Sequence, residues 1–458
     1  MSELTSTSSV AATSTVSPIA KPSFKKAFYF WLKLGFISFG GPAGQIGIMH
    51  TFLVDQKKWI SDRKFLHALN YCMLLPGPEA QQLAIYIGWL LHGTIGGVVA
   101  GTLFVLPSVF ILLGLSTIYV VFGKIAWVAA LFYGLKPAVV AIVILALIKI
   151  AKKSLLSLLH VLVAIASFIG IFFLNIPFPF IILGAILIGW LAKKFYPTIF
   201  NETKSANEIA ANEQEYYLNM DSAVPNTGFR LGSLIKQILI IGLLWAIPFV
   251  VFSMSQGAPF WQRLVTFFTK AAFVTVGGAY AVLPYVAQVA VEDFNWLTKL
   301  EMIDGLALGE TTPGPLIMVL AFVGFMAGYH QFSGSIAMGA LGLVTTTYYT
   351  FLPCFLFILA GAPIIEKTQS NKSVKAILGV VTAAVVGVVL NLTVYFAQAV
   401  VFPRNLALSD IDYFSLAWII ISFVAMYRFK IGMITWIGIS AMAGLMYYLI
   451  TNYVTPLH

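Results

Sequence analysis

Two kinds of helix-breaking motif each occur twice in this sequence, and their backbone chemistry suits an anion. They are Gly40-Gly41-Pro42, Pro76-Gly77-Pro78, Gly277-Gly278 and Pro313-Gly314-Pro315. Pro-Gly-Pro removes two backbone donors and cannot continue a helix, whereas Gly-Gly allows a close approach of backbone or ligand. Each break starts a new helix whose free N–H groups and partial positive charge favour an anion. Structural kinks and small-residue helix packing are the competing interpretation.

Neutral hydrogen-bonding side chains lie next to two of these breaks. Gln81 and Gln82 follow the first Pro-Gly-Pro, and Thr311 and Thr312 precede the second. Amides and hydroxyls can bind the oxygens of an oxyanion, but each could equally bond a neighbouring backbone group. We therefore predict these four residues as substrate-binding candidates together with the breaks.

Two lysines occupy equivalent places relative to the Gly-Gly motifs. Lys33 and Lys270 each lie seven residues before a Gly-Gly pair, within apolar segments. Charged residues inside such segments are rare and often functional, so these two could attract a divalent oxyanion. The alternative is that their side chains extend to the lipid headgroups.

Two carboxylates break the symmetry of the motifs. Glu79 directly follows the first Pro-Gly-Pro, and Glu310 lies three residues before the second. An ionised carboxylate beside an anion site repels the anion and a protonated one admits it, which would couple protons to transport. A helix-terminal charge or a buried hydrogen-bond partner is the simpler interpretation of each.

The motifs belong to an internal duplication. Shifted by 237 residues, the chain matches itself without a gap from Phe30 to Ala84, with 13 of 55 positions identical. Beyond an insertion near His330 the match resumes at a shift of 246, where Leu106-Pro107 meets Leu352-Pro353. Gly-Gly, Trp and Pro-Gly-Pro in one ungapped frame are not an effect of composition.

The composition identifies the solvent of this chain as a lipid bilayer. Hydrophobic residues make up 60% of the 458 residues and charged residues 10%, and the mean hydropathy is +0.92. Runs of about 20 apolar residues recur, and they are continuously apolar, which favours helices over a β-barrel. The net charge of +10 comes from basic residues at the ends of these runs, as in cytoplasmic loops, and does not indicate nucleic-acid binding.

The order of the apolar elements predicts an inverted repeat. We expect elements at about 28–54, 65–91, 94–122, 125–150, 155–174, 177–192 and 235–254, so that an odd number of crossings separates equivalent points. Broken helices in inverted halves are typical of secondary transporters. Lys57, Lys58, Arg63 and Lys64 would face outward if 28–54 crossed the membrane, so the positive-inside rule favours re-entrant hairpins, with crossing helices left open.

The domain boundaries follow from composition. Residues 1–23 form a polar tail expected to be disordered, 24–195 the N-terminal repeat, 196–232 a polar linker, and 233–458 the C-terminal repeat with its equivalent core from about 264. The six histidines form no cluster with metal-ligand spacing, and Cys72 and Cys354 lie far apart in apolar stretches. We expect no enzyme activity, no metal and no cofactor.

The motifs resemble the chromate ion transporter family in its long, two-half form. The resemblance is carried by residues 36–42, 75–82 and 88–89, and by 273–280 and 311–315. It implies a multi-pass inner-membrane protein that exports chromate and confers chromate resistance, and the distribution of basic residues predicts that its N-terminus is cytoplasmic. Sulfate is the physiological look-alike, because both dianions are tetrahedral.

Several functions stay open on the sequence alone. The alternatives to chromate export are uptake of sulfate or another anion and a passive anion channel. The expected partners are the oxyanion and the lipid bilayer, with a homodimer also open.

Overall fold

The chain folds into an all-helical polytopic membrane protein, as predicted. The computed structural model describes residues 20–195, 215–219, 222, 231–365, 372–403, 405 and 407–454. Most of the expected tail (1–23) and linker (196–232) therefore lies outside the described residues. Among those described, seven helices are long and apolar enough to cross a membrane.

The described helices of the two halves follow the same order. The first half contains α1 (Phe24–Ile37), α2 (Gly41–His50), α3 (Asp62–Cys72), α4 (Glu79–Phe122), α5 (Ala126–Ser154), α6 (Leu158–Phe172) and α7 (Phe178–Phe195). After α8 (Leu231–Ser253), the second half contains α9 (Ala258–Val274), α10 (Ala279–Gln288), α11 (Lys299–Thr311), α12 (Val319–Gln331), α13 (Ile336–Ile365), α14 (Lys372–Val401), α15 (Tyr413–Tyr427) and α16 (Met433–Leu449). The extra helix of the second half arises because α4 corresponds to α12 and α13 together.

Local signals at equivalent positions start and separate these helices. Ser61 caps α3 and Thr298, 237 residues later, caps α11 through a capping box with Glu301. Outside glycine, positive φ angles occur at the equivalent positions Lys58 and Asn295, at 50° and 52°. The duplication seen in the sequence is therefore also a duplication of backbone geometry.

The first two elements of each half are re-entrant hairpins. Helix α1 spans 14 residues, and α2 with the π-helical turn that continues it (Thr51–Gln56) spans 16, about 21 and at most about 24 Å, so each is too short to cross a hydrocarbon core of about 30 Å. The chain returns beside its own start, since the Phe30 and Trp59 rings lie 5.3 Å apart and the Phe24 and His92 rings 5.5 Å apart. The favoured alternative of the sequence analysis is thus the one the chain adopts.

The second half repeats these returns. The Phe267 and Trp296 rings lie 5.7 Å apart, and the Trp261 and Phe332 rings also lie 5.7 Å apart. In the first half, non-helical angles at His92 and Gly93 divide α4 into the end of a hairpin and a spanning helix. This division agrees with the predicted elements 65–91 and 94–122.

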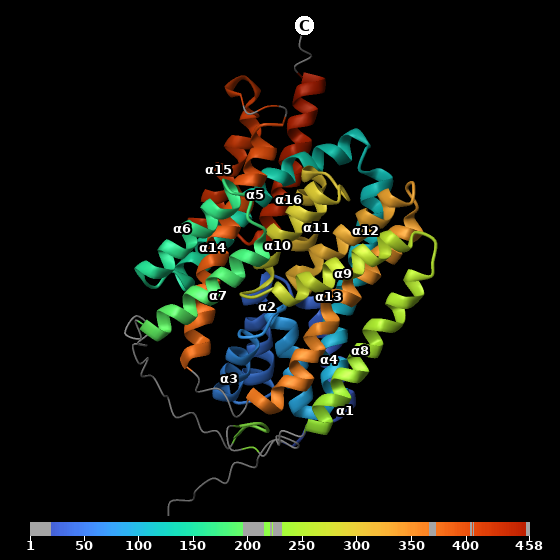
Figure 1. Ribbon diagram of the computed structural model, residues 1–458. Helices are drawn as coiled ribbons and strands as arrows, with labels where there is room; N and C mark the ends of the chain where they lie inside the picture. Colours follow the sequence, from blue (N-terminus) through green and yellow to red (C-terminus); the bar gives the residue numbers. More distant parts are fainter. Residues whose placement is uncertain are drawn as a thin grey trace, which may run out of the picture.

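The halves are inverted relative to each other. The second part of α4, α5 and α8 cross between equivalent points, and the pair α6 and α7 adds an even number of passes. In Figure 1 the hairpins of the first half accordingly lie at the bottom and those of the second half higher up. We call the face where α1 begins the N-terminal face, and the other the opposite face.

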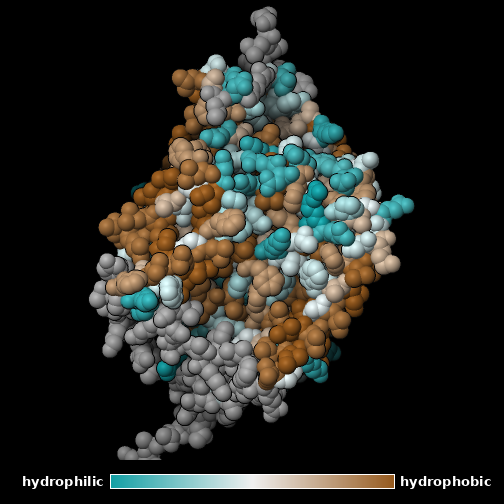
Figure 2. All heavy atoms as spheres, in the orientation of Figure 1, coloured by the Kyte–Doolittle hydropathy of each residue, from teal (hydrophilic) through white to brown (hydrophobic). Residues whose placement is uncertain are grey.

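Lipid-facing surfaces account for the exposed apolar side chains. Figure 2 shows hydrophobic residues along the flanks of the molecule and hydrophilic residues in its upper part. No residue in the membrane-spanning window of α8 is fully buried, and α7 exposes Phe180, Leu183 and Leu187. In a bilayer these side chains are in their preferred solvent.

A short part of the expected linker is packed against the first hairpin. The backbone N–H of Ser61 donates to Leu218, the N–H of Leu218 donates to Trp59, and Lys58 pairs with Glu215 at 2.5 Å. Leu218 is buried in the core of the first hairpins. This segment therefore covers the hairpin loop on the N-terminal face.

Candidate functional site

The helix breaks of the two halves meet reciprocally at the centre of the molecule. The N–H of Gly77 donates to the carbonyl of Thr275 at 2.7 Å, and the N–H of Gly314 donates to that of Ser38 at 2.8 Å. The two bonds are equivalent in the repeat, because Gly314 corresponds to Gly77 and Thr275 to Ser38, each at a shift of 237 residues. The inverted repeat therefore places its four breaks around one pseudo-twofold axis.

Close packing explains the glycines of the two Pro-Gly-Pro motifs. Gly77 and Gly314 have φ angles of +122° and +99°, which side chains rarely adopt. A Cβ on Gly314 would lie 1.9 Å from Ser108 Oγ, and one on Gly77 would lie 2.8 Å from Cys354 Sγ. Ser108 and Cys354 are themselves repeat equivalents, so each motif is held by the spanning helix of the other half.

A cavity of about 700 Å³ lies beside these breaks. It is lined by α2, α3, the start of α4, the end of α5, α10 and α14, and it extends to Lys153 and Ser154 at the end of α5. Its volume is well above what a tetrahedral oxyanion occupies, and it falls in the usual range for small-ligand pockets. Of the predicted site residues, Pro42, Glu79, Gly277 and Gly278 line it.

Three helix N-termini contribute to the walls of this cavity. The N-cap residues of α2, α4 and α10 are Gly40, Pro78 and Gly278, and none of the three helices has a side-chain cap. Their N-terminal turns reach the cavity through Pro42, Glu79 and Ala279. Because each helix N-terminus carries about half a positive charge, together they favour an anion.

Two lysines that the sequence analysis did not single out supply most of the formal positive charge. Lys149 and Lys153 lie one helical turn apart on α5, and both line the cavity. Their i, i+4 spacing at the end of an apolar run was the available signal, but basic residues there are also ordinary membrane anchors. Placing them beside the Gly-Gly break of the other half requires the tertiary structure.

Both candidate coupling carboxylates flank the start of α10. Glu79 lines the cavity, and its Oε1 lies 3.5 Å from where a Cβ on Gly278 would sit. Glu310 is 4% exposed and accepts a 2.6 Å hydrogen bond from the hydroxyl of Tyr280, which also lines the cavity. The two residues are unrelated by the repeat but reach the same helix N-terminus.

The neutral candidates are packed behind the breaks. Gln82 donates to the carbonyl of Pro76 at 2.5 Å, and both threonine hydroxyls, of Thr311 and Thr312, donate to Leu308 at 2.9 and 2.7 Å. Gln81 is fully buried, and its amide has no hydrogen-bond partner within the described part of the chain. These four residues lie outside the set that lines the cavity.

The remaining candidates lie elsewhere. Lys33 lines a separate pocket on the outside of the first hairpin, where its Nζ lies 5.4 Å from the centroid of the Phe52 ring. Lys270 is exposed on α9, and Gly40 and Gly41 form the turn into α2. Pro313 accepts a hydrogen bond from Ser108, beside Gly314 and Pro315.

Comparisons with known proteins agree with this architecture. The sequence matches the chromate transporter family over residues 25–190 and again over 261–445, once for each half. It is 27% identical to a chromate transport protein of Cupriavidus metallidurans over 82% of this chain and 83% of that protein. It is 30% identical to a chromate transport protein of Pseudomonas aeruginosa over 85% of each.

A half-length relative has the size of one repeat. An uncharacterized transporter of Bacillus subtilis is 29% identical over 143 residues, which are 31% of this chain and 73% of that protein. No solved structure matches the chain. With the family matched across both halves, the resemblance noted in the sequence is confirmed: this chain belongs to the chromate transporter family.

Proposed function

We propose that this protein is a secondary transporter that exports chromate, or a similar tetrahedral oxyanion such as sulfate, through the cavity beside the helix breaks. The observation that carries the proposal is the meeting of Lys149 and Lys153 with three uncapped helix N-termini around one cavity. The family relatives named as chromate transport proteins support the choice of anion. Uptake of sulfate or another anion is the second candidate.

The orientation is proposed from the distribution of charge. Lys57, Lys58, Arg63 and Lys64 follow the first hairpin at the N-terminal face, and Lys193 and Lys194 end α7 there. The equivalent loop at the opposite face carries Glu292, Asp293 and Glu301 with Lys299. By the positive-inside rule the N-terminal face is cytoplasmic, in the inner (plasma) membrane of the cell.

Coupling to protons is proposed to involve Glu79. Its carboxylate shares the cavity with Lys149, Lys153 and His67, and with the N-terminus of α10. When ionised it neutralises part of the positive field that attracts a dianion, and when protonated it leaves that field to the substrate. Proton binding and anion binding in this cavity are therefore linked, which makes transport depend on pH.

The test is chromate uptake into inverted membrane vesicles that contain the protein. Vesicles are measured with and without a proton gradient, with and without excess sulfate, and against vesicles lacking the protein. Accumulation that depends on the gradient supports proton-linked export, and suppression by sulfate supports recognition of tetrahedral dianions in general. An uptake equal to that of protein-free vesicles under every condition would remove chromate as the substrate.

A further inference from the structure

The hairpins of the two halves pack differently against the rest of the molecule. In the second half α10 packs against α14, and α11 packs against α5, α14 and α16. The equivalent helices α2 and α3 instead pack on α4, and most of their buried residues form a hydrophobic core separate from the main one. The cavity occupies the space that this difference leaves in the first half.

The repeat identifies which residues fill the corresponding space in the second half. His67 and Thr382 line the open cavity, and their equivalents are Asp304 and Lys136, at shifts of 237 and 246 residues. Lys136 Nζ lies 3.3 Å from Asp304 Oδ1, and the side chains are 18% and 4% exposed. Where one half is open, the other is therefore closed by an ion pair.

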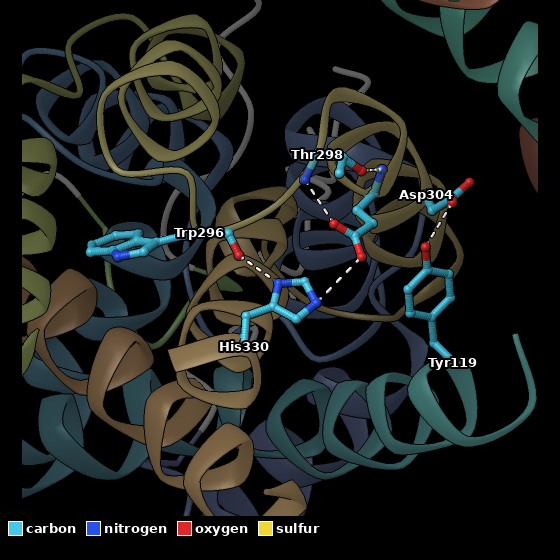
Figure 3. A network of polar contacts seen from close by, with 6 residues as sticks. Tyr119, Trp296, Thr298, Asp304 and His330 are labelled. Atoms are coloured by element: carbon cyan, nitrogen blue, oxygen red, sulfur yellow. Dashed lines mark hydrogen bonds and ion pairs between the residues drawn. The ribbon is translucent and has the colours of Figure 1, made fainter. Parts of the chain in front are cut away.

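A tyrosine completes this closure. The hydroxyl of Tyr119 donates a 2.9 Å hydrogen bond to Asp304 Oδ2, as Figure 3 shows. The ring of Tyr119 packs edge-on against Phe132 and Phe322, at centroid distances of 5.0 and 5.5 Å. Asp304 belongs to a hairpin of the second half, and its two partners, on α5 and α4, belong to the first half.

The hairpins of the second half are also tied to each other. His330 of α12 lies 3.5 Å from Glu301 of α11, and its other ring nitrogen lies 2.9 Å from the carbonyl of Trp296 (Figure 3). These contacts stay within one half, so they would survive a movement of the hairpins as a unit. The contacts of Asp304 would not, because they join the two halves.

We propose that Asp304, Lys136 and Tyr119 form the gate that closes the transport path toward the opposite face. A buried ion pair is costly to dehydrate, and its ions regain hydration when water enters, so the pair can exist in a closed, paired state and an open, hydrated one. Breaking it lets α11 separate from α5 and gives the second half the cavity that the first half now has. The inference rests on the transport function proposed above.

The experiment compares thiol accessibility on the two sides of the gate. In a background with Cys72 and Cys354 replaced by serine, single cysteines are placed at Ala307 and at its equivalent Asn70, which lines the open cavity. In intact cells a membrane-impermeant maleimide labels cysteines that are open to the outside, and in inverted vesicles it labels those that are open to the cytoplasmic side. With Asp304→Asn we expect labelling of Ala307→Cys from outside to rise about tenfold and labelling of Asn70→Cys from inside to fall.

Matched variants separate a gate from general loosening. Tyr119→Phe should shift both labels in the same directions as Asp304→Asn. The control is Tyr133→Phe, which removes a partly buried hydrogen bond from a tyrosine hydroxyl to Asp412 and should leave both labels unchanged. The charge swap Lys136→Asp with Asp304→Lys should restore the pattern of the parent.

Two outcomes would overturn the gate. One is labelling at Ala307 that does not respond to Asp304→Asn, and the other is a rise at both positions together, which indicates unfolding rather than alternation. The readout needs no chromate, so it is independent of whether chromate uptake succeeds.

Discussion

At the scale of single residues, the site is defined by charge brought together from distant parts of the chain. Lys149 and Lys153 line the same cavity as Glu79 and the start of α10. A dianion there would meet two ammonium groups and free backbone N–H groups rather than one dedicated binding side chain. This arrangement suits a transporter, because binding is distributed and release stays easy.

Removing one cavity lysine should weaken anion recognition. We expect Lys153→Gln to raise the KM for chromate uptake about tenfold, because a hydrogen bond to a charged group contributes roughly 1.5 kcal/mol. Its neighbour Lys152 has the same charge but contacts Tyr427 at 3.4 Å outside the cavity, so Lys152→Gln is the control and should leave KM unchanged. Equal effects of the two substitutions would argue for a general surface potential instead.

Replacing the cavity carboxylate should remove its control by pH. Glu79→Gln mimics the protonated state, so we expect chromate binding to persist and the rate of uptake to lose its dependence on pH. Uptake is measured in vesicles across a pH series, with Glu215→Gln as a control carboxylate that pairs with Lys58 outside the cavity. A pH profile identical to that of the parent would dismiss the coupling role of Glu79.

Only some of the residues that line the cavity could be predicted from the sequence. Glu79 was identifiable because ionisable residues in apolar segments are rare, and Gly277 and Gly278 because their motif recurs in the duplication. Lys33 and Lys270 are also charged residues in apolar segments, yet the structure places both away from the cavity. Which lysines face a common space depends on the tertiary packing, and spacing along the chain does not encode it.

At the scale of elements, the helix breaks both join the two halves and contribute to the candidate site. Each Pro-Gly-Pro motif ends a hairpin helix and donates one N–H across the axis, and the first also precedes the N-terminus of α4 at the cavity. Their existence and pairing followed from the duplication. The contacts with Ser108 and Cys354 did not, because those residues are unremarkable members of apolar spanning helices.

Adding a methyl group at the axis should be far more damaging than adding one at the edge of a break. Gly41 and Gly314 both have positive φ angles, and alanine costs about 1–2 kcal/mol in that region. Only Gly314→Ala also collides with Ser108, whereas a Cβ on Gly41 meets nothing within 4 Å. We expect the thermal midpoint of the purified protein to fall clearly more for Gly314→Ala than for Gly41→Ala.

A second substitution makes the cause testable. Ser108→Gly removes the atoms that a Cβ on Gly314 would strike, so this background should rescue the collision, and in it Gly314→Ala should lower the midpoint no more than Gly41→Ala does in the parent. Failure of this rescue would mean that the close approach at the axis is not what selects glycine there.

At the scale of the whole molecule, two inverted halves pack so that a cavity of about 700 Å³ opens beside the hairpins of the first half. The duplication and the count of crossings predicted the inversion, and the distribution of basic residues favoured the re-entrant hairpins. The asymmetry between an open first half and a closed second half could not be predicted. It arises from substitutions at equivalent positions, such as His67 against Asp304, whose consequence depends on partners from the other half.

The topology itself can be tested at two equivalent loops. Lys58 and Asn295 share a left-handed conformation but lie on opposite faces in an inverted repeat. In a cysteine-free background, Lys58→Cys should react with an impermeant maleimide only in inverted vesicles, and Asn295→Cys only in intact cells. Labelling of both from the same side would contradict the inversion.

The central claim, that an oxyanion binds in the cavity between the breaks, is tested most directly by equilibrium binding of radiolabelled chromate to the purified protein. The parent, Lys152→Gln and the double variant Lys149→Gln/Lys153→Gln are compared, each with excess unlabelled sulfate as competitor. In the parent and in Lys152→Gln we expect saturable chromate binding that sulfate displaces. In the double variant we expect the affinity for chromate to be at least about tenfold lower. Undiminished affinity in the double variant would place the anion elsewhere in the protein and contradict the account.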